Sequence, residues 1–290
     1  IASSRFKNKI RPIKLCYYGE VTRKKGSMLR PERQFLQVGS EIIGSDSILA
    51  DIEIISLAYK SLKDIGITNI TLELTSKIFL AEIFSKIKDF NSLNKLKIFI
   101  KQKDIKNSLA LIKHKDHRFL LKCLFNLTGS CRDLDKKINN FKLPHSLKLE
   151  LDIIKKISKK INFNNNVGIT YDFAEINNID YHYGIKFTFF AKDVRGEIAS
   201  GGRYKIKRND TEESAVGFTC FMDTVLRASS FENSKKKILI PFETDDDTRS
   251  KLRKKKYIIY SFLGDTSDIR FSAKNNFCTH IYENNKIKKI

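Results

Sequence analysis

The amino-acid sequence predicts an α+β fold that is built from strand pairs and amphipathic helices. Two pairs of alternating apolar and polar runs indicate antiparallel strand pairs, at residues 13–21 with 33–44 and at 185–191 with 196–200. A long stretch with helical spacing, residues 91–161, separates the two pairs. The pattern therefore predicts two strand pairs with a helical region between them.

Composition narrows the class of protein. The 290 residues are 41% hydrophobic and include 21 Phe, which is typical of a globular chain with a substantial core. No run reaches the ~18 apolar residues of a membrane span, and no secretory pattern opens the chain. The 5 Cys are scattered without a CxxC pair. We therefore expect a reduced, cytoplasmic protein without structural zinc, and we expect a segment to precede Ile1.

The net charge of +22 would suit a nucleic-acid partner. Lysine is, however, spread over nearly every segment and accompanies heavy use of Ile and Asn, as in an A/T-biased coding background. We therefore interpret the lysines as solvated faces, and we expect only salt-sensitive, non-specific binding to RNA.

The first predicted strand pair carries a candidate ligand face. Strand 13–21 is followed by a basic loop, and the chain returns as strand 33–44. Because side chains alternate along a strand, Arg33, Gln37 and Glu41 fall on one face. A cation, an amide and a carboxylate together suit a small zwitterionic ligand, with the carboxylate taking its ammonium group. The alternative is a solvated sheet face.

Helices and short strands fill the middle of the chain. A capped helix over 45–66, a strand over 70–74 and a helix over 76–88 precede the helical region, in which turns are expected at Gly129-Ser130 and Pro144. The helical region shows no catalytic pattern, and its histidines lack metal-ligand spacing.

The second strand pair is rich in polar and aromatic donors. Tyr181, His182, Arg203 and Tyr204 lie beside the glycines that border the hairpin. Glycine at strand margins suits places where another group approaches the backbone closely. The alternative is an ordinary core hairpin with buried tyrosines. A strand over 214–221, followed by a helix through Ala228, completes a main domain at residues 1–232.

The C-terminal part alternates between strand and helix. A Lys-rich link leads to a small α/β unit at residues 237–290. Its expected elements are strands 238–241, 257–262 and 277–282 and helices 247–254 and 265–274.

Several motifs resemble those of class II histidyl-tRNA synthetases. Residues 23–44 look like motif 2, and Gly217-Phe218 looks like motif 3. Tyr181-His182-Tyr183-Gly184 and Gly201-Gly202-Arg203-Tyr204 look like the two histidine motifs of that family. This resemblance implies a class II aminoacyl-tRNA synthetase-like antiparallel sheet flanked by helices, with a helical insertion at about 91–161 and the small unit behind it.

The groups that would handle ATP depart from the family pattern. Lys25 stands where the motif 2 carboxylate is expected, Asn177 where the catalytic arginine is expected, and Thr224 where the motif 3 arginine is expected. Loss of two guanidiniums removes charge stabilisation that adenylate formation needs. We therefore expect no synthetase activity and no catalytic residue.

The histidine-reading positions are better preserved. Arg23, Gln37 and Glu41 match the family, Tyr181 and Tyr204 match aromatic positions of the imidazole pocket, and His182 replaces a tyrosine. This combination resembles the ATP phosphoribosyltransferase regulatory subunit, as do the runs Tyr17-Tyr18-Gly19 and Phe35-Leu36-Gln37-Val38-Gly39. The histidine-binding residues that the resemblance implies are Arg23, Gln37, Glu41, Tyr181, His182 and Tyr204.

The resemblance also implies a function and partners. That family activates the short-form catalytic subunit in the first step of histidine biosynthesis, within a hetero-octamer, and confers feedback inhibition by histidine. We expect the same here, together with a self-dimer, no cofactor, no metal, no membrane and no specific nucleic acid. Two alternatives stay open: a divergent histidyl-tRNA synthetase, and an RNA-binding paralogue that uses the positive charge.

Overall fold

The computed structural model describes residues 5–6, 8–24, 32–138, 141, 143–161, 168–176, 182–208, 211–229, 236–264 and 268–290. The chain divides into two compact units, Ile1–Ser230 and Phe231–Ile290. Lys25, Asn177 and Tyr181, which the sequence singled out, lie outside the described residues. No described helix is both long and apolar enough to cross a membrane.

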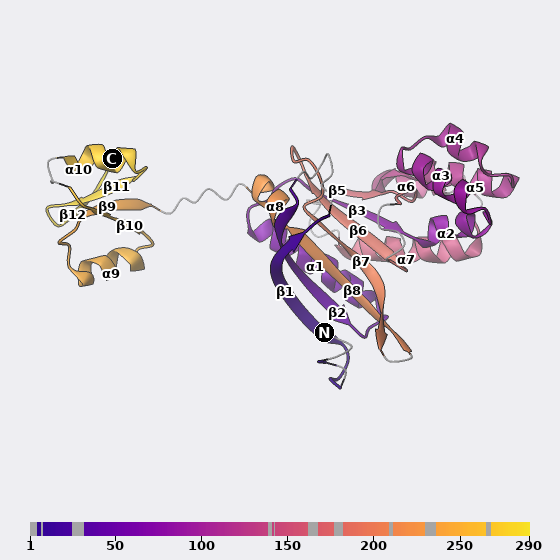
Figure 1. Ribbon diagram of the computed structural model, residues 1–290, viewed down its shortest axis with the longest axis horizontal. Helices are drawn as coiled ribbons and strands as arrows, with labels where there is room; N and C mark the ends of the chain where they lie inside the picture. Colours follow the sequence, from indigo (N-terminus) through magenta and orange to yellow (C-terminus); the bar gives the residue numbers. More distant parts are fainter. Residues whose placement is uncertain are drawn as a thin grey trace. The chain divides into compact units, whose positions relative to one another are not determined.

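An eight-stranded sheet forms the centre of the first unit (Figure 1). Its order is β1-β2-β8-β7-β6-β3-β5-β4. The strands are β1 (Ile13–Thr22), β2 (Gln34–Ile43), β3 (Ile70–Ser76), β4 (Gly129–Ser130), β5 (Gly168–Tyr171), β6 (Ile185–Ala191), β7 (Ala199–Arg208) and β8 (Thr211–Phe221).

The sheet is mainly antiparallel, as the sequence predicted, and it contains one parallel pair. Strands β3 and β5 pair in parallel, while their neighbours pair antiparallel. Parallel neighbours require a crossover connection, and here the helices between β3 and β5 supply it. The predicted turn at Gly129-Ser130 is β4, which pairs with β5.

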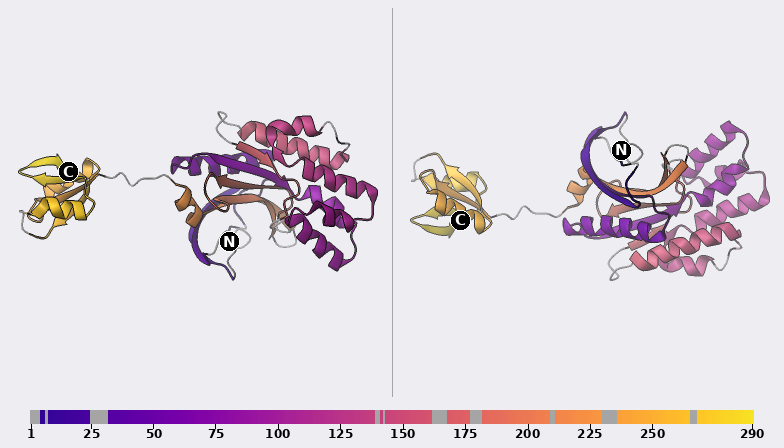
Figure 2. Two further views of the ribbon diagram at one scale, coloured as in Figure 1. Left: turned by 90° about the horizontal axis from the view of Figure 1, so that it is seen from above. Right: turned by 90° about the horizontal axis from the view of Figure 1, so that it is seen from below.

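Helices cover one face of the sheet and build the insertion. Helix α1 begins after Ser47, whose hydroxyl accepts a hydrogen bond from the Leu49 amide at 3.2 Å. Helices α1 and α7 contact each other and lie along one side of the sheet (Figure 2). The helices of this unit are α1 (Ile48–Asp64), α2 (Ile78–Ser85), α3 (Phe90–Lys101), α4 (Ile105–Ala110), α5 (Lys115–Asn126), α6 (Cys131–Ile138), α7 (His145–Ile161) and α8 (Met222–Ala228).

The two faces of the sheet differ in chemistry. Toward the helices, Leu72, Leu74, Phe187 and Phe189 are fully buried in the main core. On the other face, one row of register partners crosses all eight strands without a single apolar side chain. The row is Tyr17, Gly39, Thr219, Ser200, Thr188, Glu73, Thr170 and Ser130. A polar row across a sheet predicts a hydrated, ligand-accessible surface rather than a packing face.

The second hairpin strand differs from its prediction. It spans Ala199–Arg208 instead of 196–200, because it stays paired with β8 along its whole length. The Gly201-Gly202 pair therefore lies inside a strand and not at its margin. A Cβ at Gly201 would overlap the Gly217 carbonyl oxygen and approach the Phe187 ring at 2.5 Å, so close strand packing requires glycine there.

The second unit is a small α/β sheet of order β10-β9-β11-β12. Its apolar residues form two clusters, one around α10 and one around α9. Strand β12 was not predicted from the sequence. The elements are β9 (Lys237–Pro241), α9 (Asp246–Lys254), β10 (Ile258–Phe262), α10 (Ile269–Asn275), β11 (His280–Glu283) and β12 (Lys286–Lys289).

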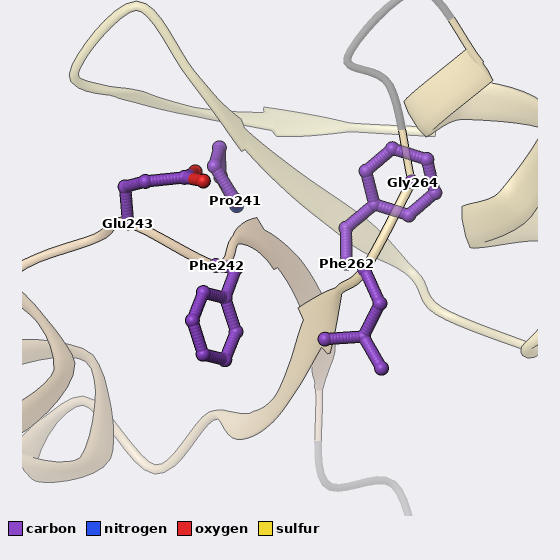
Figure 3. A pocket seen from close by; sticks show the side chains of 6 residues that line it. Pro241, Phe242, Glu243, Phe262 and Gly264 are labelled. Atoms are coloured by element: carbon purple, nitrogen blue, oxygen red, sulfur yellow. The ribbon is translucent and has the colours of Figure 1, made fainter.

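A shallow pocket of about 190 Å³ lies at the carboxyl ends of β9 and β10 in this unit (Figure 3). Phe242 and Glu243 contribute from one strand end, and Phe262 and Leu263 from the other. Among the described residues that line this pocket, Glu243 is the one carboxylate, no side chain is a titratable base, and none was singled out from the sequence.

Candidate functional site

A cavity of about 500 Å³ opens on the polar face of the main sheet. Strands β2, β7 and β8 form its floor, and β1 and the segment before β6 form its walls. The lining residues are Tyr17, Gln37, Glu41, His182, Ser200, Gly201, Gly202, Tyr204, Gly217, Phe218, Thr219 and Phe221. Four of the six predicted histidine-binding residues thus share one cavity.

Glu41 is the charged centre of the cavity. The Tyr204 hydroxyl donates a hydrogen bond to its Oε2 at 2.9 Å. Burial raises the pKa of Glu41 to about 7, and the hydrogen bond from Tyr204 opposes that rise. A desolvated carboxylate gains most when a cationic nitrogen pairs with it, so this part of the cavity favours an ammonium or another positively charged donor.

Glycine holds the Glu41 carboxylate against the floor. Glu41 is the register partner of Gly217, and a Cβ added at Gly217 would overlap the carboxylate group. The side chain of Glu41 therefore lies across the β8 backbone. Any side chain at position 217 would push it out of this place.

His182 forms another part of the cavity lining. Its ring lies over Gly202, where an added Cβ would come within 2.8 Å of Nδ1. Burial, and to a smaller extent the nearby Lys186, lowers the pKa of His182 to about 4. The imidazole is therefore neutral at physiological pH, and it adds hydrogen-bonding capacity without a charge.

Tyr17, Ser200 and Thr219 were missed by the sequence reasoning as cavity residues. The Tyr17 and Thr219 hydroxyl groups lie 2.5 Å apart, and Tyr17 is opposite Gly39. Two features of the sequence could have indicated Tyr17: the strand alternation, and the run Tyr17-Tyr18-Gly19, which resembles the regulatory-subunit family. Alternation alone does not reveal which residues of separate strands lie opposite each other.

Arg23 occupies the border of the cavity and is absent from its lining. Its guanidinium lies 4.2 Å from the centroid of the Phe35 ring and 5.7 Å from that of Phe221, which does line the cavity. Arg33 donates from Nε to the Arg23 carbonyl oxygen at 3.4 Å. The electrostatic attraction between the guanidinium and the ring faces holds Arg23 at this border.

The side chains of Arg203 and Thr224 are buried and make contacts that hold elements of the fold together. Arg203 is 6% exposed and makes a bidentate pair with Asp51 of α1, at 3.0 and 2.8 Å. Thr224 is fully buried in α8, and its hydroxyl lies 2.9 Å from the carbonyl oxygens of Phe221 and Glu197. Neither side chain lines the cavity.

The charges of the lining decide what the cavity can accept. Within the part of the chain that the structure describes, no lysine or arginine lines it. A triphosphate would meet a carboxylate and a neutral imidazole there, without a counter-charge. A small ligand with a cationic nitrogen would meet a matching carboxylate, an amide and several hydroxyl groups. In the described residues no group of His, Cys, Asp or Glu is placed to hold a metal ion.

Comparison with known proteins places the chain in a class and then in a family. Residues 1–225 match the family model described as histidyl-tRNA synthetase. A solved structure described as an ATP phosphoribosyltransferase regulatory subunit/histidyl-tRNA synthetase from Bacillus halodurans has the same fold. Its TM-score is 0.69 at 20% identity, over 94% of this chain and 74% of that one. The fold is therefore that of the class II histidyl-tRNA synthetases.

Two curated relatives are more specific. An ATP phosphoribosyltransferase regulatory subunit of Paramagnetospirillum magneticum is 29% identical over 97% of this chain and 73% of the relative. One of Clostridium botulinum is 31% identical over 94% of this chain and 70% of the relative. The chain belongs to the family of ATP phosphoribosyltransferase regulatory subunits.

Proposed function

We propose that this protein activates a short-form ATP phosphoribosyltransferase catalytic subunit, and that its cavity binds histidine as the feedback inhibitor. Family membership supports the first part. The observation that carries the second is a cavity that keeps Glu41, Gln37 and Tyr204 but has no lysine or arginine among its described lining residues. Assembly as a hetero-octamer, self-dimerisation and a cytoplasmic location belong to the same proposal.

Linkage gives the physical basis of feedback. Histidine must bind one state of the assembly more tightly than another in order to shift its activity. A buried carboxylate that pairs with a ligand cation can supply such a difference, because the binding free energy depends on how the cavity is arranged in each state of the assembly.

Complex formation tests the proposal. The full chain is co-expressed with a short catalytic chain and purified by a tag on the catalytic chain alone. We expect the two to elute together at a mass above that of either alone. Separate elution at high protein concentration would contradict the proposed partnership.

A divergent histidyl-tRNA synthetase is the second candidate, because the matching family model carries that description. Pyrophosphate exchange into ATP in the presence of histidine separates the two functions. We expect no exchange above the blank, because the described lining residues include no lysine or arginine that could pair with a triphosphate. Histidine-dependent exchange would show that the protein has synthetase activity and would contradict the proposed function.

The pH dependence of histidine binding follows from Glu41. Its raised pKa of about 7 means that the carboxylate is largely protonated below neutrality. Binding of a cationic nitrogen requires the ionised form, so affinity should fall by up to about tenfold per pH unit below about pH 7 and level off above it. Calorimetric titration at several pH values measures this slope. The imidazole of free histidine also titrates in this range and affects both proteins alike, so the slope of Glu41→Gln is subtracted from that of wild type. An identical slope in both proteins would contradict the assignment of Glu41 as the group that binds the cationic nitrogen.

Gly217→Ala tests the placement of that carboxylate. The new methyl group would displace Glu41, and we expect histidine affinity to fall by about tenfold or more with the fold retained, since the desolvated charge pair is lost. Gly19→Ala is the matched control, because a Cβ there meets nothing within 4 Å. Equal affinities of the two variants for histidine would place the ligand elsewhere.

A further inference from the structure

The shallow pocket of the second unit lies at a switch point of its sheet. Strands β10 and β11 lie on the two sides of β9, and both are parallel to it. Helices α9 and α10 pack on opposite faces, because Ile238 and Ile240 share a cluster with Leu252 of α9, whereas Leu239 shares one with Ala273 of α10. The chain therefore leaves β9 and β10 toward opposite faces of the sheet. In open α/β sheets, ligands bind beyond the carboxyl ends of the strands at such a point.

Arg249 of α9 holds the walls of this pocket in place. Its guanidinium donates to the carbonyl oxygens of Phe242 and Thr244 at 2.7 and 2.9 Å, and to the Ser261 hydroxyl at 3.0 Å. One side chain thus ties the loop after β9 to the end of β10. Because these bonds are made within the unit, the walls are fixed before a ligand arrives, which lowers the entropic cost of binding.

Two aromatic rings and one carboxylate line the pocket. Phe242 is 61% exposed, and the Phe262 ring lies against Gly264, where an added Cβ would come within 3.1 Å of it. Figure 3 shows the two rings on different sides of the pocket and the Glu243 side chain extending toward the space between them. Leu263, which is 82% exposed, continues the apolar surface. Glu243 is exposed and makes no hydrogen bond or ion pair with another residue that the structure describes, so it can accept an incoming donor.

The charge around the pocket selects a cationic partner. Helix α9 begins at this edge with Asp245, Asp246 and Asp247, and it ends at the opposite edge with Lys254 and Lys255, since a helix between parallel strands runs antiparallel to them. Among the described lining residues there is no lysine or arginine. The phosphates of a nucleic acid would be repelled here, whereas a positively charged segment would be attracted, although the chain as a whole carries a charge of +22.

We propose that this edge of the second unit is a docking surface for a partner protein, and that its pocket receives an arginine side chain flanked by apolar residues. The volume of about 190 Å³ is below the ~300–1,000 Å³ of pockets for drug-sized ligands, and it suits a single side chain. A guanidinium stacks on aromatic faces and matches a carboxylate with its planar fork, which favours arginine over lysine between Phe242, Phe262 and Glu243. The proposal does not depend on the histidine cavity.

Two peptides that differ only in charge test this proposal. Acetyl-Leu-Arg-Leu-amide and its citrulline counterpart, which keeps the shape of arginine without the charge, are titrated into the full chain carrying isotope-labelled phenylalanine. The nuclear magnetic resonance signals of the Phe242 and Phe262 amides, assigned by replacing each residue with leucine, report occupancy of the pocket. We expect both signals to shift and saturate with the arginine peptide, and the citrulline peptide to bind about fivefold or more weakly.

Glu243→Gln should lower the affinity for the arginine peptide to that for the citrulline peptide, and it should leave the citrulline affinity unchanged. Asp247→Asn is the matched control, since this exposed carboxylate belongs to the same edge but does not line the pocket. The proposal is overturned if neither peptide shifts the two signals, if both peptides bind equally, or if the two variants weaken the arginine peptide equally. It is also overturned if oligouridylate shifts the signals more strongly than the arginine peptide.

Histidine titration of wild type and Glu243→Gln separates this proposal from the proposed function. Glu243 is not among the described residues that line the histidine cavity, so the two proteins should bind histidine equally. Loss of peptide binding with histidine binding intact contradicts only the docking surface, and the reverse result contradicts only the histidine site.

Discussion

Replacement of Glu41 by glutamine is expected to weaken histidine binding by about 10- to 100-fold, while activation of the catalytic chain persists. Glutamine keeps the shape and can still accept the Tyr204 hydrogen bond, but it lacks the charge that a buried cationic nitrogen requires. A hydrogen bond with charge assistance is worth about 1.5–3 kcal/mol, which sets this range. The measurements are histidine inhibition curves and calorimetric affinity for the reconstituted pair.

Glu41→Gln should bind histidine more weakly but should be more stable than wild type at alkaline pH. The folded-state pKa of Glu41, about 7, lies above its ordinary value, so the folded state favours the protonated carboxyl group. The resulting stability is present at low pH and is lost as the pH rises through about 7. Glu41→Gln should therefore melt higher than wild type at about pH 8 and nearly equally at about pH 5. Glu53→Gln, an exposed carboxylate on α1, is the control for both effects. Unchanged histidine inhibition in Glu41→Gln would place the effector site elsewhere.

Arg203→Ala is expected to lower the free energy of unfolding by about 3–5 kcal/mol, because it leaves the buried Asp51 carboxylate without its partner. The guanidinium also donates to the carbonyl oxygens of Ser45 and Ser47, at 2.6 and 3.1 Å. It therefore fixes the start of α1 on the sheet. Urea unfolding followed by circular dichroism measures the loss.

A double-mutant cycle separates this ion pair from general damage. Arg203→Ala combined with Asp51→Ala should cost clearly less than the sum of the single changes, since the second change removes the stranded charge. Lys205→Ala, on the same strand, breaks an exposed pair with Glu212 and an ammonium contact 5.2 Å from the centroid of the Tyr183 ring, and it should have little measurable effect. Additive costs in the cycle would show that Asp51 and Arg203 do not depend on each other.

Much of the fold could be predicted from local patterns. Alternation at 13–21 and 33–44 indicated β1 and β2, and it correctly placed Gln37 and Glu41 on one face. Helical spacing indicated α1 and the insertion. The parallel pairing of β3 and β5 was not predictable, because it depends on the direction in which the whole insertion returns the chain to the sheet.

The site could be predicted only in part. Gln37, Glu41, His182 and Tyr204 were identified from motifs and line one cavity. Ser200 and Thr219 lie in ordinary strand sequence, and only their register across β7 and β8 brings them to the cavity floor. Arg203 shares a motif with Tyr204, yet strand alternation turns it to the opposite face, where α1 needs a counter-ion.

The most direct test of the account is the phosphoribosyl transfer rate of a short catalytic chain, measured with and without an equimolar amount of this protein and across a histidine titration. We expect the rate to rise when this protein is added and to fall again as histidine saturates the cavity, with the fall shifted to higher histidine concentration in Glu41→Gln. A rate that does not respond to the added protein, or a histidine response that Glu41→Gln leaves unchanged, would contradict it.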